Sequence, residues 1–204
     1  MLEDLSNLTQ SRWFEEGECS LQILEVCLEE DVLALSLTIN DFNGENSQLW
    51  KVDCVGPLEH KVTLGGNFYE IGSFSDHVLL WPYLHPSASL SFFGESTDPL
   101  AVVGALYSAH KKAVGHWFCF DRFLNGDPFE MIRGRYGMLA EGPVPLLAAY
   151  AEVLEECGLR NGISEPRPAP YTNDSTVRIE EIGLLTLGHD SYVVASKFHA
   201  ERLE

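Results

Sequence analysis

The N-terminal part of the chain carries a clear alternation of apolar and polar positions. From residue 33 to residue 39, every odd position is Leu or Ile and every even position is Ala, Ser or Thr, which is the period of a half-buried strand. Residues 21–28 are apolar on both faces and predict an inner strand, while residues 50–54 and 60–64 predict two shorter strands. Asn43-Gly44 is typical of a hairpin turn, because both residues tolerate a positive φ. The region therefore predicts an antiparallel meander.

The middle of the chain changes to a helical period. Residues 78–83 and 88–93 still predict extended segments, but Asp98-Pro99 predicts the start of a helix that ends at Gly115. An aspartate at the N-cap accepts hydrogen bonds from free N–H groups, and proline fits the first helical position. The apolar face predicted for this helix consists of Leu100, Val103, Tyr107, His110 and Val114. Residues 118–124 predict an extended segment or a short helix, and residues 144–157 predict a second main helix.

The C-terminal part is divided by a stretch rich in proline and glycine. Residues 158–175 predict a loop, and residues 177–182, 183–187 and 192–198 predict strands, the last two joined by a turn at 188–191. Because an isolated hairpin is marginally stable, we expect it to pair with the first sheet. The predicted fold class is α+β: one domain over residues 1–204, with an antiparallel sheet (N-terminal meander plus C-terminal hairpin) packed with two main helices.

The net charge narrows the classes of partner. The chain has 13 Lys and Arg against 31 Asp and Glu, a formal charge of −18. Such a charge repels phosphates and therefore argues against nucleic acid or an anionic membrane as the main partner. The charge is also uneven, since residues 110–136 carry a net +2 and residues 1–50 carry eleven acidic residues against Arg12. Ordinary solubility, with much of the charge on a solvated face, is the favoured interpretation of this acidity; the alternative is that the acidic part attracts a basic protein partner.

The N-terminal residues and the cysteines predict a cytoplasmic protein. The first residues are acidic where a secretory signal is basic, and no apolar run is long enough to span a membrane. The five cysteines are odd in number and show no CxxC spacing, which favours free thiols in a reducing compartment.

The common catalytic motifs are missing from the sequence. There is no GxSxG, no Walker GxxxxGK[ST], no GxGxxG and no HExxH. Residues 108–111 match SxxK, a pattern that can pair a serine nucleophile with a lysine base. The SDN and KTG motifs that accompany it are missing, so we interpret these residues as a solvated helix face. Residues 41–45 resemble the start of a calcium loop, but the glycine is at the fourth position instead of the sixth, and the twelfth position is Val52 instead of a glutamate, so we interpret them as a hairpin turn. We therefore predict no catalytic residues, no cofactor and no metal, and favour a protein that is not an enzyme.

Histidines and aromatic residues concentrate in the middle of the chain. Four of the seven histidines lie between residues 77 and 116, and 12 of the 22 aromatic residues lie between residues 68 and 123. The histidine spacings fit no metal pattern, so the segment predicts either part of the core or a ligand pocket. The candidate pocket residues are His77, Trp81, His110, His116, Asp121, Arg133 and Arg135.

Two features of these candidates suggest chemistry. Asp121 lies between aromatic residues, so desolvation would raise its pKa and make it an acid, with His116 as a conceivable base; a structural Asp121–Arg122 pair is the favoured alternative. Arg133 and Arg135 suit a carboxylate or phosphate group of a ligand.

Three functions remain open at this point. The first, which the sequence favours, is an acidic interaction or regulatory protein that binds a basic protein partner, for example as an inhibitor or immunity-type protein of a nuclease. The alternative is a small-molecule-binding protein or enzyme with its pocket in residues 77–136. The third is a structural subunit that associates with itself through an exposed edge strand, so a homo-oligomer is possible.

Overall fold

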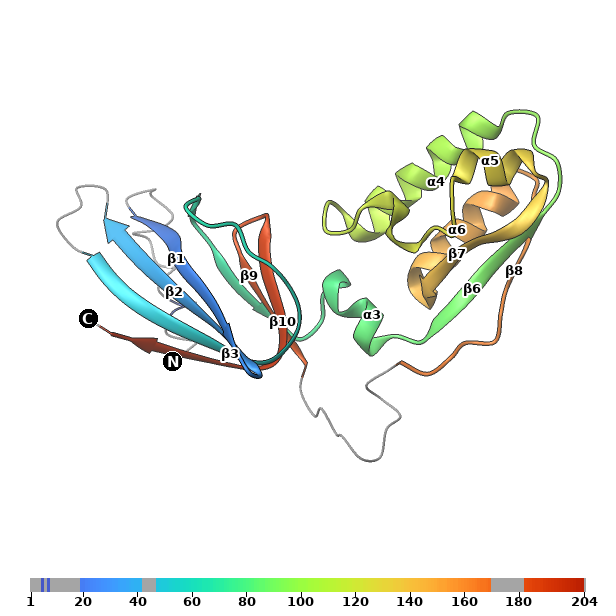
Figure 1. Ribbon diagram of the computed structural model, residues 1–204. Helices are drawn as coiled ribbons and strands as arrows, with labels where there is room; N and C mark the ends of the chain where they lie inside the picture. Colours follow the sequence, from blue (N-terminus) through green and yellow to red (C-terminus); the bar gives the residue numbers. More distant parts are fainter. Residues whose placement is uncertain (1–4, 6, 8–18, 42–46, 170–181, 204) are drawn as a thin grey trace. The chain divides into compact units, whose positions relative to one another are not determined.

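The computed structural model describes residues 5, 7, 19–41, 47–169 and 182–203. The chain divides into two compact units, of which unit 1 comprises Met1–Leu80 with Ile179–Glu204 and unit 2 comprises Trp81–Arg178 (Figure 1). Each unit has its own sheet and is described by itself. The expectation of a single domain stays a prediction.

Unit 1 is built on a seven-stranded antiparallel sheet in the order β4-β1-β2-β3-β10-β9-β5. Its strands are β1 (Cys19–Glu29), β2 (Val32–Asp41), β3 (Ser47–Lys61), β4 (Asn67–Phe68), β5 (Ile71–Phe74), β9 (Gly183–Leu187) and β10 (Ser191–Arg202). The 3₁₀ turn η1 (Val78–Leu80) follows β5 in the chain. The meander β1–β3 and the hairpin β9–β10 are the predicted ones, and β10 pairs with β3. The expected return of the C-terminal hairpin to the first sheet is therefore confirmed.

The alternation in β2 decides which face of this sheet is buried. Its four odd residues from Leu33 to Ile39 are at most 1% exposed. They join one core cluster with residues of all the neighbouring strands: Leu21, Ile23, Trp50, Val52, Cys54, Leu185, Leu187 and Val193. The even positions of β2 lie on the opposite face, which is polar. The predicted strand period is confirmed, because the odd positions are buried and the even positions 34 and 36 are only half-buried; Thr38 is the even residue that is also buried, at 8% exposure.

Strand β3 differs from the expectation. Two strands were predicted, at 50–54 and 60–64, whereas a single strand runs from Ser47 to Lys61. Gly56-Pro57 interrupts the sequence pattern, but Gly56 takes φ +60°, and the register shifts at Leu58, next to the proline, because Val194 and Ala195 of β10 pair with Glu59 and Pro57. A bulge accommodates the proline that would otherwise end the strand. The predicted turn at Asn43-Gly44 and most of the predicted strand 177–182 lie outside the described residues.

Unit 2 contains a three-stranded antiparallel sheet in the order β7-β6-β8, with helices packed on one face (Figure 1). Its elements are α3 (Trp81–Leu84), β6 (Ser87–Phe93), α4 (Pro99–Val114), the 3₁₀ turn η2 (Phe120–Phe123), α5 (Pro128–Arg133), β7 (Tyr136–Pro143), α6 (Val144–Glu156) and β8 (Arg160–Ile163). The two main helices, α4 and α6, pack against each other, and α6 contacts all three strands. The α+β fold class is confirmed, and the sheet that these helices pack on is the small second one.

Helix α4 has the predicted ends but a shifted face. The Asp98 side chain accepts a hydrogen bond from the N–H of Ala101 at 3.0 Å, and Gly115 ends the helix with φ +63°. Its buried residues are Val102, Leu106, His110 and Val114. The prediction was wrong for Leu100 and Tyr107, which are 68% and 47% exposed. The predicted set of apolar residues and the observed one both have a helical period. The contact of α4 with α6 decides that the observed set is buried.

Several short elements were not predicted correctly. Residues 78–83 were expected to be extended but form η1 and the start of α3. Helix α5 and strand β7 were not anticipated, and β8 lies within the expected loop 158–175. Strand β8 is only four residues long and mostly polar, so its sequence has no strand pattern; its pairing with β6 makes it a strand. In the described part of the chain, no helix has the length and apolar character to cross a membrane.

Candidate functional site

His110 is the one candidate residue that is completely buried. Its Nε2 lies 2.9 Å from the carbonyl oxygen of Phe118, and its Nδ1 lies 2.7 Å from the hydroxyl of Tyr150. Because a carbonyl only accepts, Nε2 donates to Phe118, and in a neutral ring Nδ1 then accepts from the Tyr150 hydroxyl. Burial lowers the pKa of His110, and neighbouring Lys111 adds to this, against the opposing hydrogen bond to Phe118. The ring is therefore a neutral link between α4, α6 and the segment before η2.

The remaining candidates of unit 2 lie nearer the surface. His116, Asp121, Arg133 and Arg135 are exposed, and Trp81 is half-buried. Asp121 follows Phe120, whose ring lies 5.5 Å from that of His110. The Asp121 side chain is exposed, however, whereas the His110 side chain is buried.

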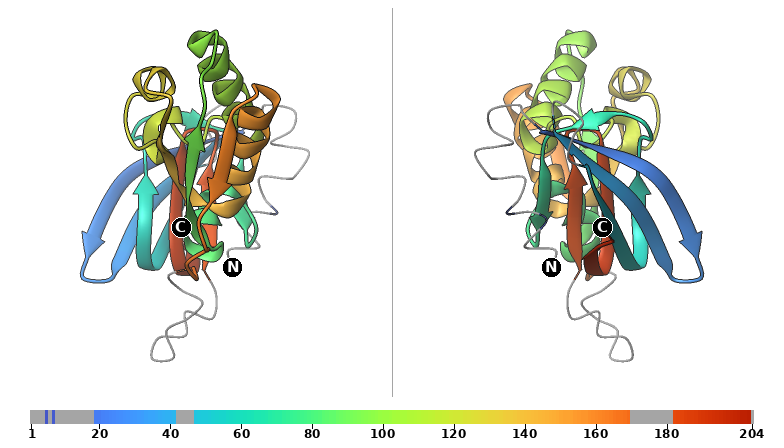
Figure 2. Two further views of the ribbon diagram at one scale, coloured as in Figure 1. Left: turned by 90° about the vertical axis from the view of Figure 1, so that its right-hand side faces the viewer. Right: turned by 90° about the vertical axis from the view of Figure 1, so that its left-hand side faces the viewer.

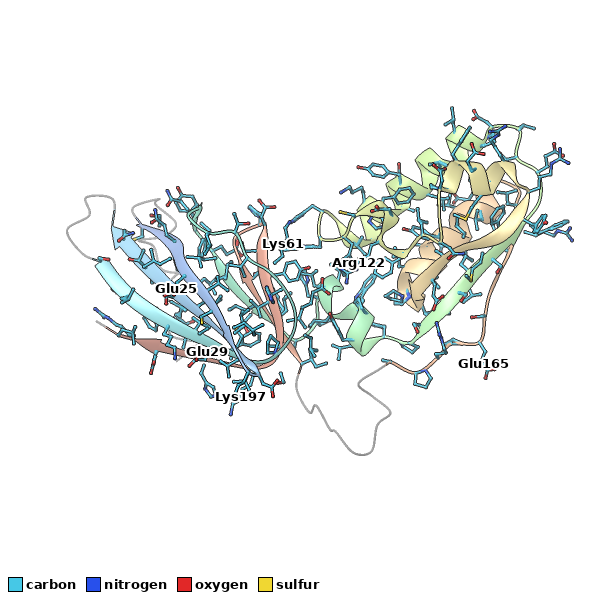
Figure 3. All side chains as sticks on the ribbon, viewed as in Figure 1. Glu25, Glu29, Lys61, Arg122, Glu165 and Lys197 are labelled. Atoms are coloured by element: carbon cyan, nitrogen blue, oxygen red, sulfur yellow. The ribbon has the colours of Figure 1, made fainter. Side chains whose placement is uncertain are left out.

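The two arginines each have an acidic neighbour. Arg133 lies 3.1 Å from Glu130 within α5, and Arg135 lies 2.8 Å from Glu95. Arg122, which is labelled in Figure 3, follows Asp121. Its guanidinium lies 4.5 Å from the ring centre of Phe118. These arginines therefore already contact groups of unit 2, whether carboxylates or rings.

His77 belongs to unit 1, where its Nδ1 accepts a hydrogen bond from the N–H of Leu79. None of the seven candidates lines the hollow beside Phe93 and Arg160, the hollow between α4 and α6, or the hollow at Glu29, Glu30 and Asp53. Within the same part of the chain, no three His, Cys, Asp or Glu side chains are grouped to hold a metal ion. The pocket in residues 77–136 stays a prediction, with its candidates dispersed over buried and exposed positions.

A second candidate surface is the polar face of the unit 1 sheet. The register aligns three rows across β1, β2, β3 and β10. We define the polar face by the side chains of these rows: Glu25, Cys27, Glu29, Val32, Ala34, Ser36, Lys51, Asp53, Val55, Lys197, His199 and Glu201. The turn residue Glu30 joins them, because it lines one hollow together with Glu29 and Asp53. Figure 3 marks Glu25 and Glu29 along β1 and Lys197 on β10.

The electrostatics of the polar face are negative. With its turn, the face holds five acidic residues against two lysines: Glu25, Glu29, Glu30, Asp53 and Glu201 against Lys51 and Lys197. By sequence, unit 1 as a whole holds twenty of the acidic residues against five basic ones, −15 of the total charge of −18. On the polar face, the Lys51 ammonium lies 3.1 Å from both carboxylate oxygens of Asp53. The Asp53 carboxylate raises the pKa of Lys51, and Glu201 and Glu29 act in the same direction. Of the two lysines on this face, Lys51 is thus already paired with a carboxylate.

The turn and the edge of β1 add two unusual features. Glu30 takes φ +50°, a left-handed conformation that a side chain with a Cβ rarely adopts. Leu24 and Leu28 of β1 are 52% and 59% exposed. The expectation that residues 21–28 form an inner strand holds only near Leu21, where the two-residue β4 pairs with β1. The sequence shows that Leu24 and Leu28 are apolar, but it does not show that they are exposed. Their exposure depends on where β4 ends, and β4 pairs only with Leu21 and Gln22.

Unit 2 exposes a smaller aromatic surface on the side of its sheet opposite the helices. Phe93 of β6 pairs with Tyr136 of β7, and the two are 54% and 72% exposed. The guanidinium of Arg160 lies 4.6 Å from the Phe93 ring centre, and both residues line a hollow with Ser91. The alternation of Ala88, Leu90 and Phe92 with serines could have predicted this two-sided strand.

Known proteins give no guide to either surface. Comparison of the chain with protein-family models, with curated proteins and with solved structures finds no match.

Proposed function

We propose that the chain is a non-enzymatic interaction protein that binds a basic protein partner through the polar face of unit 1. The observation that carries the proposal is the concentration of charge: unit 1 has a net charge of −15 and unit 2 only −3. An inhibitor or immunity-type protein is one concrete form, because nucleases have basic phosphate-binding surfaces. A negative field of this size accelerates the encounter with such a partner.

The arrangement of charges on the polar face supports this role. Glu25, Glu29 and Glu201 are exposed, and Glu30 is exposed at the adjoining turn. The basic residues of the face are Lys51, which is paired with Asp53, and Lys197. The exposed carboxylates therefore leave an excess of negative charge for a partner to neutralise.

A comparison of two triple variants with equal charge change tests the proposal. In Glu25→Gln/Glu29→Gln/Glu30→Gln the charge is removed from the polar face and its turn. In the control, Glu152→Gln/Glu156→Gln/Glu165→Gln, the same charge is removed from exposed positions of unit 2. Exposed surface substitutions of this kind change stability by only about 0.5 kcal/mol each, so both variants should fold.

The measurement is affinity capture from the native host at low and high salt, followed by identification of the bound proteins and titration of the purified candidate. We expect a basic protein that binds at low salt, is released by added salt and binds the polar-face variant about tenfold more weakly, since each exposed charge pair contributes up to about 1 kcal/mol. The control should bind like the original chain. Equal losses in both variants, insensitivity to salt or an acidic partner would contradict the proposal.

A further inference from the structure

The second half of β1 is a free sheet edge within the described part of unit 1. Strand β4 pairs only with Leu21 and Gln22, and the N–H of Gly65 donates to the carbonyl of Ile23 at 3.3 Å. From Val26 onward, no described strand lies on that side of β1. The β1–β2 hairpin forms one margin of the sheet in both views of Figure 2.

The register shows which backbone groups of β1 point outward. The two-residue turn Glu30-Asp31 joins Glu29 to Val32, and Cys27 pairs with Ala34. In a two-residue hairpin the residues that flank the turn exchange hydrogen bonds, and alternate pairs do so along the ladder. The backbone N–H and C=O groups of Val26 and Leu28 therefore point away from β2. Such a row of groups is a template for an added strand.

The side chains along this edge present two different faces. Val26 and Leu28 pair with Leu35 and Leu33, so they lie on the apolar side of the sheet, where Leu28 is 59% exposed. Glu25 and Glu29 lie on the polar face and are also exposed. A strand placed beside β1 would thus meet apolar side chains on one face and carboxylates on the other.

We infer that the β1 edge binds an extended segment of the partner, in which basic residues alternate with apolar ones. The basic residues pair across the strands with Glu25 and Glu29, and the apolar residues cover Val26 and Leu28, because opposite charges and apolar pairs are the favourable cross-strand contacts. This inference rests on the proposed function and specifies how the basic partner is bound.

A second copy of the chain is a poorer occupant for the same edge. Two antiparallel β1 edges would place Glu25 and Glu29 of one copy beside the same residues of the other. Like charges directly opposite each other destabilise a strand pair, and each unit 1 carries a net charge of −15. Charge complementarity therefore selects a basic segment.

Three synthetic peptides with the same side chains and the same charge separate strand addition from simple attraction. The first alternates lysine with valine and leucine, the second groups its lysines in one block, and the third is the first with backbone N-methyl groups on alternate residues along one edge. Affinity is measured at low salt with the unaltered full chain. We expect the alternating peptide to bind at least tenfold more tightly than the other two.

Variants of Leu28 test the same edge from the protein side. Leu28→Pro removes an N–H that points outward, a position at which an edge strand tolerates proline. Leu28→Thr keeps the N–H and a strand-forming residue but removes most of the apolar side chain. We expect proline to weaken the alternating peptide at least tenfold and threonine two- to threefold, with thermal unfolding used to confirm that both variants fold. If the proline variant does not fold, the N-methylated peptide still tests whether binding requires backbone hydrogen bonds along the β1 edge.

The outcomes distinguish the two proposals. Equal binding of all three peptides, weakened by the polar-face triple variant, would overturn strand addition and support attraction of a basic partner. If a basic protein is captured in a salt-sensitive way and binds the Leu28→Pro variant as tightly as the original chain, strand addition is likewise overturned and attraction of a basic partner is supported. A dimer in light scattering that Leu28→Pro converts to a monomer would assign the edge to a second copy and overturn the inference.

Discussion

The hydroxyl of Tyr150 on α6 lies 2.7 Å from Nδ1 of His110 on α4, and both side chains are fully buried. The second ring nitrogen of His110 is bound to the carbonyl of Phe118. Every polar atom of the imidazole therefore has a partner inside unit 2, which makes this histidine a fixed part of the helix packing.

Replacement of Tyr150 by phenylalanine should destabilise the protein. It removes the donor to Nδ1 and leaves a buried acceptor unsatisfied, at a cost of about 1–3 kcal/mol. Chemical denaturation measures the loss in the free energy of unfolding. Tyr107→Phe is the matched control, because the Tyr107 side chain is 47% exposed and its change should stay within about 0.5 kcal/mol. Similar losses in both variants would refute the role given to the Tyr150 hydroxyl.

The stability should fall as the pH decreases below the ordinary pKa of histidine. Burial lowers the pKa of His110 in the folded state below 6.5, so in this range the unfolded chain binds a proton that the folded chain does not. The free energy of unfolding then decreases by up to about 1.4 kcal/mol per pH unit for this group, starting near pH 6.5 and ending at the folded-state pKa. Urea titrations between pH 7.5 and 5 measure it.

His110→Gln isolates this contribution from that of the other titrating groups. The variant will be less stable at every pH, but its stability should depend less on pH over the same window. Parallel curves for the variant and the original chain would show that His110 does not cause the acid sensitivity.

Replacement of Glu30 by glycine should stabilise unit 1. Glu30 has φ +50°, and a residue with a Cβ pays about 1–2 kcal/mol in this region, part of which the greater flexibility of unfolded glycine offsets. We expect a net gain of up to about 1 kcal/mol in denaturant unfolding. Glu29→Gly removes the same charge one residue earlier, within the strand, and should cost about 0.5–1 kcal/mol. A loss at both positions would contradict the strain assigned to Glu30.

The cysteines should differ in their reaction with an alkylating agent. Burial, with a smaller effect of Asp53, raises the pKa of Cys54 to about 12, and the side chain is 0% exposed. Because the thiolate is the reactive species, Cys54 should remain unmodified in the folded protein at pH 8, whereas exposed Cys119 should react. Mass spectrometry of the labelled peptides measures both. Rapid labelling of Cys54 without unfolding would contradict the burial of β3.

Local patterns predicted a large part of the fold. The alternation in β2, the N-cap at Asp98 and the glycine stop at Gly115 each depend on residues adjacent in the chain, and all are confirmed. The acidity of the N-terminal part was equally visible, since formal charge is a count. What local pattern could not supply was exposure, and the candidate pocket residues proved to be a mixture of the fully buried His110 and exposed groups such as Asp121.

The sequence by itself determined the strand and helix periods, the helix ends and the negative charge of this protein. The tertiary structure decided that Val102 and Leu106, not Leu100 and Tyr107, face the core of unit 2, that the polar residues of β8 form a strand, and that β1 has a free edge beyond β4. The physical reason is the same in each case. A period fixes which residues share a face, but burial and pairing depend on neighbours that are distant in the sequence, and these are α6, β6 and the short β4.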